Sequence, residues 1–182
     1  MNNNFLIIVD MQNDFVTGSL GTDEAKSIVE GIKEYADNFE GEIIFTRDTH
    51  YGDYNETQEG KMLPVEHCKI GSVGWDVVPE LANLITERKA KTFNKSTFGS
   101  QYLGYYIDNS TFFLSDEAYE DGVDVYICGV CTNICVISNA LLIKAFNPEI
   151  KIHVLSSLCA GTTPEMHEKA LSVMGSCLID IM

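Results

Sequence analysis

The sequence lacks any apolar run approaching the ~20 residues that a transmembrane helix needs. It also lacks a cationic segment before its first apolar run, residues 5–9, and therefore does not resemble a secretory signal peptide. We expect a cytoplasmic protein whose six cysteines are mostly reduced thiols. Low-complexity stretches and fixed-period repeats are absent, so the 182 residues are predicted to form a single domain, 1–182.

Basic residues are scarce, because 12 Lys and Arg stand against 27 Asp and Glu, which gives a net charge of −15. This charge disfavours nucleic acid and anionic membranes as partners. A small neutral substrate is favoured over a highly anionic one. Histidine is scarce too, and two of the four histidines lie in one polar stretch, residues 47–74. A loop of this length in a compact domain usually has a function.

Strand-like apolar segments alternate with helical patterns along the chain. Helices are predicted over residues 22–39, 77–86, 134–146 and 163–174, and residues 96–110 have a mixed pattern. Strands are predicted over 5–9, 42–46, 91–93, 111–114, 123–128, 150–155 and 177–181. The alternation indicates an α/β fold with three layers, a parallel β-sheet flanked by helices on both faces, as in Rossmann-like proteins.

Ligands in such folds bind at the carboxyl ends of the strands. Several chemically reactive side chains follow a predicted strand or begin a loop, so we expect them to meet at this edge. They are Asp10, Asp48, His50, Lys95 and Cys135.

Cys135 is the candidate nucleophile. It lies between the strand 123–128 and the helix 134–146, so we expect it at the start of that helix, which is exposed. The positive end of the helix dipole stabilises a thiolate there, and free N–H groups of the turn can bind an oxyanion. The spacing of Cys128, Cys131 and Cys135 leaves an iron–sulfur or zinc site open, although Cys128 is predicted to be buried and a fourth ligand motif is missing.

Asp10 and Lys95 are candidate partners of this cysteine. A carboxylate at position 10 could take the thiol proton and return it to a leaving amine, although a turn or helix-capping Asp fits the position equally well. A lysine near the sulfur would lower its pKa and stabilise negative charge. A single loop lysine is more often simply solvated.

The polar stretch also contains a candidate metal site. Asp48 and His50 are two residues apart, so in an extended segment both side chains point to one side, and Glu59 and His67 follow. Carboxylates mixed with imidazoles suit Zn²⁺, Mn²⁺ or Fe²⁺. The alternative is that His67 is a surface histidine and Glu59 a loop charge. Aromatic residues near these motifs could form a flat apolar pocket or simple core, namely Phe15, Trp75, Phe98 and Tyr102.

Four segments in this order resemble the isochorismatase-like cysteine hydrolase superfamily, and within it the nicotinamidase (pyrazinamidase) branch. They are VDMQNDF at 9–15, TRDTH at 46–50, FNKSTF at 93–98 and GVCTNICV at 129–136. The resemblance covers nearly the whole chain. It implies the catalytic triad Asp10, Lys95 and Cys135, a cis peptide between Val130 and Cys131, and an oxyanion hole formed by the N–H groups of Cys131 and Cys135.

The same resemblance implies one divalent metal ion, Zn²⁺ with Mn²⁺ or Fe²⁺ as alternatives, held by Asp48, His50, Glu59 and His67. Many nicotinamidases have a second histidine shortly after the D-x-H motif, whereas residues 51–54 contain none here, so Glu59 takes that role. Phe15, Phe98 and Tyr102 are the expected substrate pocket. Related proteins are commonly oligomeric, which favours a homo-oligomer.

The expected activity is a cysteine amidohydrolase that converts nicotinamide to nicotinate and ammonia through a thioester. Superfamily members that cleave isochorismate generally lack the cysteine, so Cys135 favours amide chemistry. Two alternatives stay open. One is hydrolysis of another amide, a carbamoyl or ureido compound, and the other is a catalytically idle binding protein.

Overall fold

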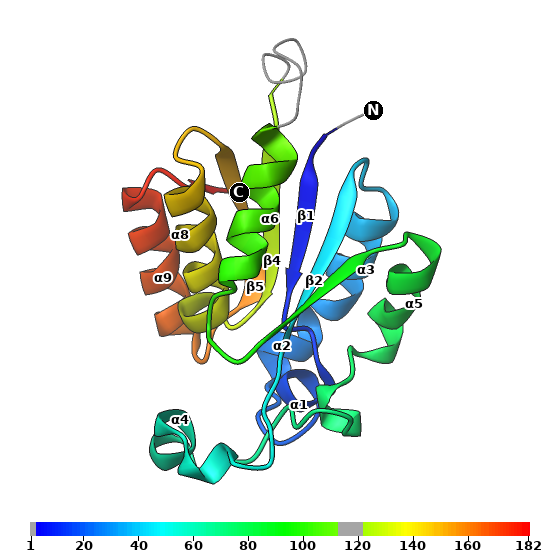
Figure 1. The fold of residues 1–182 in the computed structure, drawn as a ribbon, viewed down its shortest axis with the longest axis vertical. Helices are drawn as coiled ribbons and strands as arrows, with labels where there is room; N and C mark the ends of the chain where they lie inside the picture. The colour runs from blue at the N-terminus through cyan, green and yellow to red at the C-terminus, as the bar shows by residue number, and fades with distance from the viewer. Residues whose placement is uncertain (1–2, 113–121) are drawn as a thin grey trace.

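A computed structural model, which describes residues 3–112 and 122–182, contains a parallel β-sheet in the order β3-β2-β1-β4-β5-β6 (Figure 1). All neighbouring strands in this sheet are parallel. The strands are β1 (Phe5–Val9), β2 (Glu42–Asp48), β3 (Lys91–Lys95), β4 (Asp124–Val130), β5 (Lys151–Ala160) and β6 (Asp180–Ile181). The predicted α/β class is therefore confirmed.

Helices cover both faces of the sheet and complete the three predicted layers (Figure 1). On one face α3 packs against α5, and on the other α6 packs against α8 and α8 against α9. The α-helices are α1 (Asn13–Val16), α2 (Asp23–Ser27), α3 (Val29–Asp37), α4 (Gln58–Met62), α5 (Pro79–Glu87), α6 (Gln101–Phe112), α8 (Ile137–Phe146) and α9 (Pro164–Ser176). Short helical turns are η1 (Tyr54–Glu56), η2 (Val73–Trp75) and the π-helical η3 (Thr132–Val136).

The core lies around the central strand β1, whose five residues are all buried. This burial explains the unbroken apolar run, because a central parallel strand is covered on both faces. Strand order reverses between β1 and β4, where the crevice at the carboxyl ends of the strands is the usual ligand site. The chain from residue 49 to 75, which includes α4, extends beyond that edge (Figure 1). Within the described residues, no helix is long and apolar enough to span a bilayer.

Three predicted segments differ from the structure. The predicted helix 22–39 is two helices, because Ile28 ends α2 and begins α3. The predicted strand 111–114 is wrong at residues 111 and 112, which end α6, and its other two residues lie outside the described part of the chain. The predicted strand 177–181 is reduced to Asp180–Ile181, because Cys177 closes α9 and Leu178 has a left-handed φ of 61°.

Candidate active site and metal centre

Asp10 lies directly after β1 at the strand-order reversal and is fully buried. Its φ of 50° is left-handed, which is uncommon for a residue with a side chain and often marks a functional position. Thr46 on β2 donates a hydrogen bond of 2.7 Å from Oγ1 to Asp10 Oδ1. Burial raises the pKa of the Asp10 carboxyl above its ordinary value, although the charge of Lys95 opposes the rise. The structure thus places a carboxylate of increased basicity at the ligand-binding edge.

Lys95 is the central cation of the site. It ends β3 and is buried, and its Nζ lies 2.6 Å from Asp10 Oδ2, 3.8 Å from Asp48 Oδ1 and 3.6 Å from Cys135 Sγ. Burial opposes protonation, but the charges of Asp10, Cys135 and Asp48 outweigh it and raise the pKa of Lys95. Lys95 is therefore a permanent ammonium that contacts both the carboxylate and the sulfur.

Cys135 lies within η3, the π-helical turn that joins β4 to α8. The expectation of an exposed helix start is wrong, because Cys135 is only 6% exposed. Burial raises the pKa of its thiol well above the ordinary value, Asp10 and Asp48 add to the rise, and Lys95 opposes it. The direction of this shift favours the neutral thiol, so we expect the nucleophilic sulfur to need a base.

The turn before Cys135 brings β4 close to β1. The peptide bond between Val130 and Cys131 is cis. Gly129 has a φ of 114°, and a Cβ at this position would lie 2.2 Å from the carbonyl oxygen of Val9, so only glycine fits. Asn139 on α8 donates a hydrogen bond of 2.8 Å to the carbonyl oxygen of Cys135 and fixes the turn from the other side.

Four side chains of the polar stretch form a compact group of potential metal ligands. One ligand atom from each of them lies within 4.8 Å of the others. Asp48 Oδ2 is 2.8 Å from His50 Nε2 and 3.4 Å from His67 Nε2, and Glu59 Oε1 is 3.7 Å from both imidazole nitrogens. The structure thus brings together the set Asp48, His50, Glu59 and His67.

The chemistry of this group fits a divalent cation. His67 Nδ1 lies 2.8 Å from the carbonyl oxygen of Val65, a contact in which Nδ1 donates and Nε2 keeps a free lone pair. His50 Nε2 is buried and has no hydrogen-bond partner, although Asp48 is close. Burial opposes ionisation of Asp48, but the two adjacent histidines and the charge of Lys95 hold its pKa below the ordinary value. Two imidazoles and two carboxylates are a donor set typical of Zn²⁺, Mn²⁺ or Fe²⁺.

The proposed pocket aromatics differ in their surroundings. Phe15 packs against the ring of His67 with 5.4 Å between centroids. Phe98, just before α6, and Tyr102, in its first turn, are 48% and 78% exposed, so in this structure they lie at the surface and do not form a closed pocket. Trp75 is held by a hydrogen bond from Nε1 to Thr49 Oγ1 of 2.9 Å.

Sequence reasoning missed Tyr54, which is fully buried and packs edge-on against His50, with centroids 4.6 Å apart. No local pattern marks this residue, because η1 is too short to show periodicity. The alternative cysteine cluster does not form. Among residues 3–112 and 122–182 only the Asp48 group has metal-binding geometry, and the thiol of Cys128 donates to the carbonyl oxygen of Ile7.

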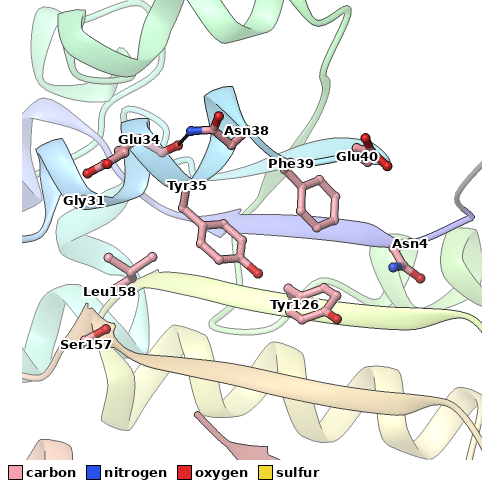
Figure 2. A pocket seen from close by; sticks show the side chains of 10 residues that line it. All are labelled: Asn4, Gly31, Glu34, Tyr35, Asn38, Phe39, Glu40, Tyr126, Ser157 and Leu158. Atoms are coloured by element: carbon pink, nitrogen blue, oxygen red, sulfur yellow. Dashed lines mark hydrogen bonds between the residues drawn. The ribbon is translucent and has the colours of Figure 1, made fainter.

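A groove of about 690 Å³ lies elsewhere, between α3 and the strands β4 and β5 (Figure 2). Its walls include Tyr35, Phe39 and Tyr126, whose rings pack together at centroid distances from 5.7 to 6.4 Å. None of the candidate catalytic or metal-binding residues lines it. The reactive groups of the chain therefore lie at the strand ends and not in this groove.

The chain is similar to known proteins both in sequence and in fold. The chain is 29% identical to the nicotinamidase/pyrazinamidase of Mycobacterium tuberculosis over 187 residues, which covers 97% of each protein. It is 27% identical to the nicotinamidase of Saccharomyces cerevisiae, over 75% of this chain and 79% of that protein. The structure of the pyrazinamidase of Pyrococcus horikoshii in complex with zinc superposes with a TM-score of 0.75 at 28% identity, over 99% of this chain and 98% of that one. The Isochorismatase domain family matches residues 4–182, and the chain belongs to that family.

Proposed function

We propose that this chain is a cysteine amidohydrolase that converts nicotinamide to nicotinate and ammonia. The observation that carries the proposal is the position of Lys95, whose Nζ contacts Asp10, Cys135 and Asp48 at once. A nucleophile, a base and a group of metal ligands thereby meet in one buried cluster. The nicotinamidases of M. tuberculosis and S. cerevisiae support the choice of substrate.

The chemistry begins with a proton transfer. Asp10 takes the proton of the Cys135 thiol, and Lys95 stabilises the thiolate that forms. The sulfur attacks the carboxamide carbon, and the backbone N–H groups of Cys131 and Cys135 hold the oxyanion. The C–N bond then breaks, and Asp10 returns its proton to the nitrogen, so that ammonia leaves and a thioester remains on Cys135.

Hydrolysis completes the cycle. Asp10, ionised again, takes a proton from water, and the resulting hydroxide attacks the thioester carbon. The carbon–sulfur bond breaks, Asp10 returns its proton to the sulfur, and the product leaves as nicotinic acid, which ionises to nicotinate in water. Asp48, His50, Glu59 and His67 would hold a divalent cation such as Zn²⁺, and the bound cation would supply a Lewis acid for the pyridine nitrogen of the substrate. This role is what the nicotinamidase resemblance implies.

The test is ammonia release from nicotinamide by the zinc-loaded protein, with Cys135→Ala and Cys177→Ala compared side by side. Cys177 is exposed and closes α9, so its substitution is a matched control for loss of a thiol. We expect kcat/KM of about 10⁴ M⁻¹s⁻¹ or more for the parent and for Cys177→Ala. Cys135→Ala should lose at least about 10⁴-fold.

Two results would contradict the proposal. Turnover retained by Cys135→Ala would exclude the nucleophile. A folded, zinc-loaded parent that releases no ammonia from nicotinamide would exclude the substrate, and carbamoyl and ureido compounds would then be assayed in the same way.

A further inference from the structure

We propose that Gln12 and Asp14 are positioning residues that set the geometry of the metal-binding side chains. This inference rests on the metal centre of the proposed function. Asp10, Gln12 and Asp14 are spaced two residues apart in the segment after β1, where Gln12 precedes α1 and Asp14 lies in its first turn. The first contributes to the triad, whereas the other two contact the backbone of the segment that carries the metal ligands.

Gln12 holds Asp48. Its fully buried amide accepts a hydrogen bond of 2.7 Å from Asp48 N at Oε1, and its Nε2 donates to Asp48 O at 2.9 Å. The second Nε2 hydrogen is donated to Trp75 O at 2.8 Å. The side chain therefore satisfies both backbone groups of Asp48 and connects them to η2.

The reason for this pairing lies in the sheet. The last paired residues of β1 and β2 are Val9 and Thr46, because the chain turns away after Asp10. Asp48 is two residues further along β2, so its N–H and C=O point in the direction of β1 but beyond the last residue of that strand. Gln12 fills that place with a side-chain amide, which continues the ladder by one step and fixes a metal ligand at its end.

Asp14 holds the other end of the metal-binding stretch. Its Oδ2 accepts a hydrogen bond of 2.7 Å from Cys68 N, the residue directly after His67. Cys68 has a left-handed φ of 45°, a conformation that needs outside support in a residue with a side chain. The carbonyl oxygen of Cys68 in turn accepts a hydrogen bond of 3.0 Å from His50 N.

One carboxylate thereby fixes two ligands. Asp14 orders Cys68, and Cys68 connects the backbones of His50 and His67. Because these ligands lie in a long stretch with only short helical turns, their convergence depends on such outside contacts. Substitutions of groups that orient metal ligands typically reduce metal affinity about 10–100-fold.

The test measures zinc affinity directly, without substrate. Metal-free full-length protein is titrated with Zn²⁺ against a competing chromophoric chelator. We expect Gln12→Glu, which keeps the size but loses both donated hydrogen bonds, to weaken binding about 10–100-fold. Asp14→Ala should weaken it similarly, whereas Asp14→Asn keeps an oxygen for Cys68 N and should bind zinc like the parent.

Asn139 provides the matched control. Like Gln12, it is a fully buried amide. Its Nδ2 donates hydrogen bonds to the carbonyl oxygens of Cys135 and Phe98, and its Oδ1 accepts one from Ser100 N. Asn139→Asp therefore loses the same number of bonds beside the nucleophile and not beside the metal ligands. It should leave the zinc dissociation constant unchanged.

The outcomes separate the possibilities. Parent-like zinc affinity in folded Gln12→Glu and Asp14→Ala would overturn the inference. Equal weakening in Asn139→Asp would also overturn it, because the effect would then be general loosening. Circular dichroism verifies folding of each variant. A parent that binds zinc but does not hydrolyse nicotinamide would refute the proposed substrate and leave this inference standing.

Discussion

At the residue scale, the cluster around Lys95 combines one buried ammonium with two buried carboxylates. Asp10 and Asp48 lie on either side of the ammonium, and both are under 6% exposed. The surroundings shift the pKa values of the two carboxyl groups in opposite directions. Burial raises the pKa of Asp10, whereas the adjacent histidines and Lys95 lower the pKa of Asp48.

This difference predicts the pH dependence of turnover. The mechanism needs Asp10 ionised, so the rate should fall as pH drops through its pKa. Because that pKa is raised, the acid limb of kcat/KM should lie above 3.8, the ordinary value for an aspartate. The measurement is a profile of kcat/KM for nicotinamide between about pH 4 and pH 9. An acid limb at or below the ordinary value would contradict the assignment of Asp10 as the base.

Lys95→Met should impair both turnover and folding. It removes the partner of two buried carboxylates, which costs about 3–5 kcal/mol in the free energy of unfolding. Turnover should fall at least about 10²-fold because the thiolate loses its cation. Urea unfolding and ammonia release measure the two effects.

Lys91→Met is the control, because Lys91 is on the same strand and its ion pair with Glu42 is exposed to solvent. The control should cost less than about 1 kcal/mol. Similar losses in the two variants would show that the buried position of Lys95 has no special role.

The sequence predicted which residues meet, since each lies at or just after the end of a strand and parallel strands end at one edge of the sheet. It did not predict the burial of Cys135, because the depth of a turn depends on how closely β4 approaches β1 at Gly129. The contacts of Gln12 and Asp14 were missed too. Their spacing after Asp10 was visible, but their partners lie 36 and 54 residues away.

At the element scale, the central strands were easier to predict than helix α6 or the short edge strand β6. Strand β1 is buried along its whole length and five of the seven residues of β4 are buried, so their apolar runs stand out. Helix α6 was missed because Tyr102 and Tyr105 lie on its exposed side, so the sequence lacks a clear helical alternation of apolar and polar residues. Its buried side is formed by Leu103, Ile107 and Thr111, which repeat every four residues and extend the helix into the predicted strand.

Helical turn η2 gives a test at this scale. A Cβ at Gly74 would lie 2.0 Å from Asp14 Oδ2. Gly74→Ala should therefore displace the carboxylate that holds Cys68, lower the melting temperature and weaken zinc binding. Differential scanning calorimetry and the zinc titration measure these effects.

Gly52→Ala is the matched control in the same polar stretch, because a Cβ there would meet no atom within 4 Å. It should leave both quantities close to those of the parent. Unchanged zinc affinity in Gly74→Ala would show that the metal centre tolerates movement of Asp14.

At the scale of the whole molecule, the site joins residues at or just after the carboxyl ends of β1, β2, β3 and β4. Bound metal should therefore stabilise the entire fold. At a free Zn²⁺ concentration about 100 times the dissociation constant, binding adds about 2.7 kcal/mol. For a chain of this size, that free energy should raise the melting temperature by about 5–10 °C.

Thermal unfolding with EDTA, and again after Zn²⁺ is restored, measures this shift. Asp48→Asn keeps the shape of the side chain and removes one charged ligand, so its melting temperature should respond much less to zinc. An equal response in Asp48→Asn would place the stabilising ion elsewhere on the protein.

Asp48 connects the metal-binding histidines with Lys95, so changes in these two parts of the site should be coupled in evolution. One of its oxygens faces the histidines and the other faces Lys95. A relative that lost the metal ion but kept the aspartate would retain an additional buried negative charge beside the ammonium of Lys95. Loss of metal dependence and change at position 48 should therefore arise together during divergence. Relatives that lack the equivalents of His50 and His67, yet keep the aspartate, would contradict this constraint.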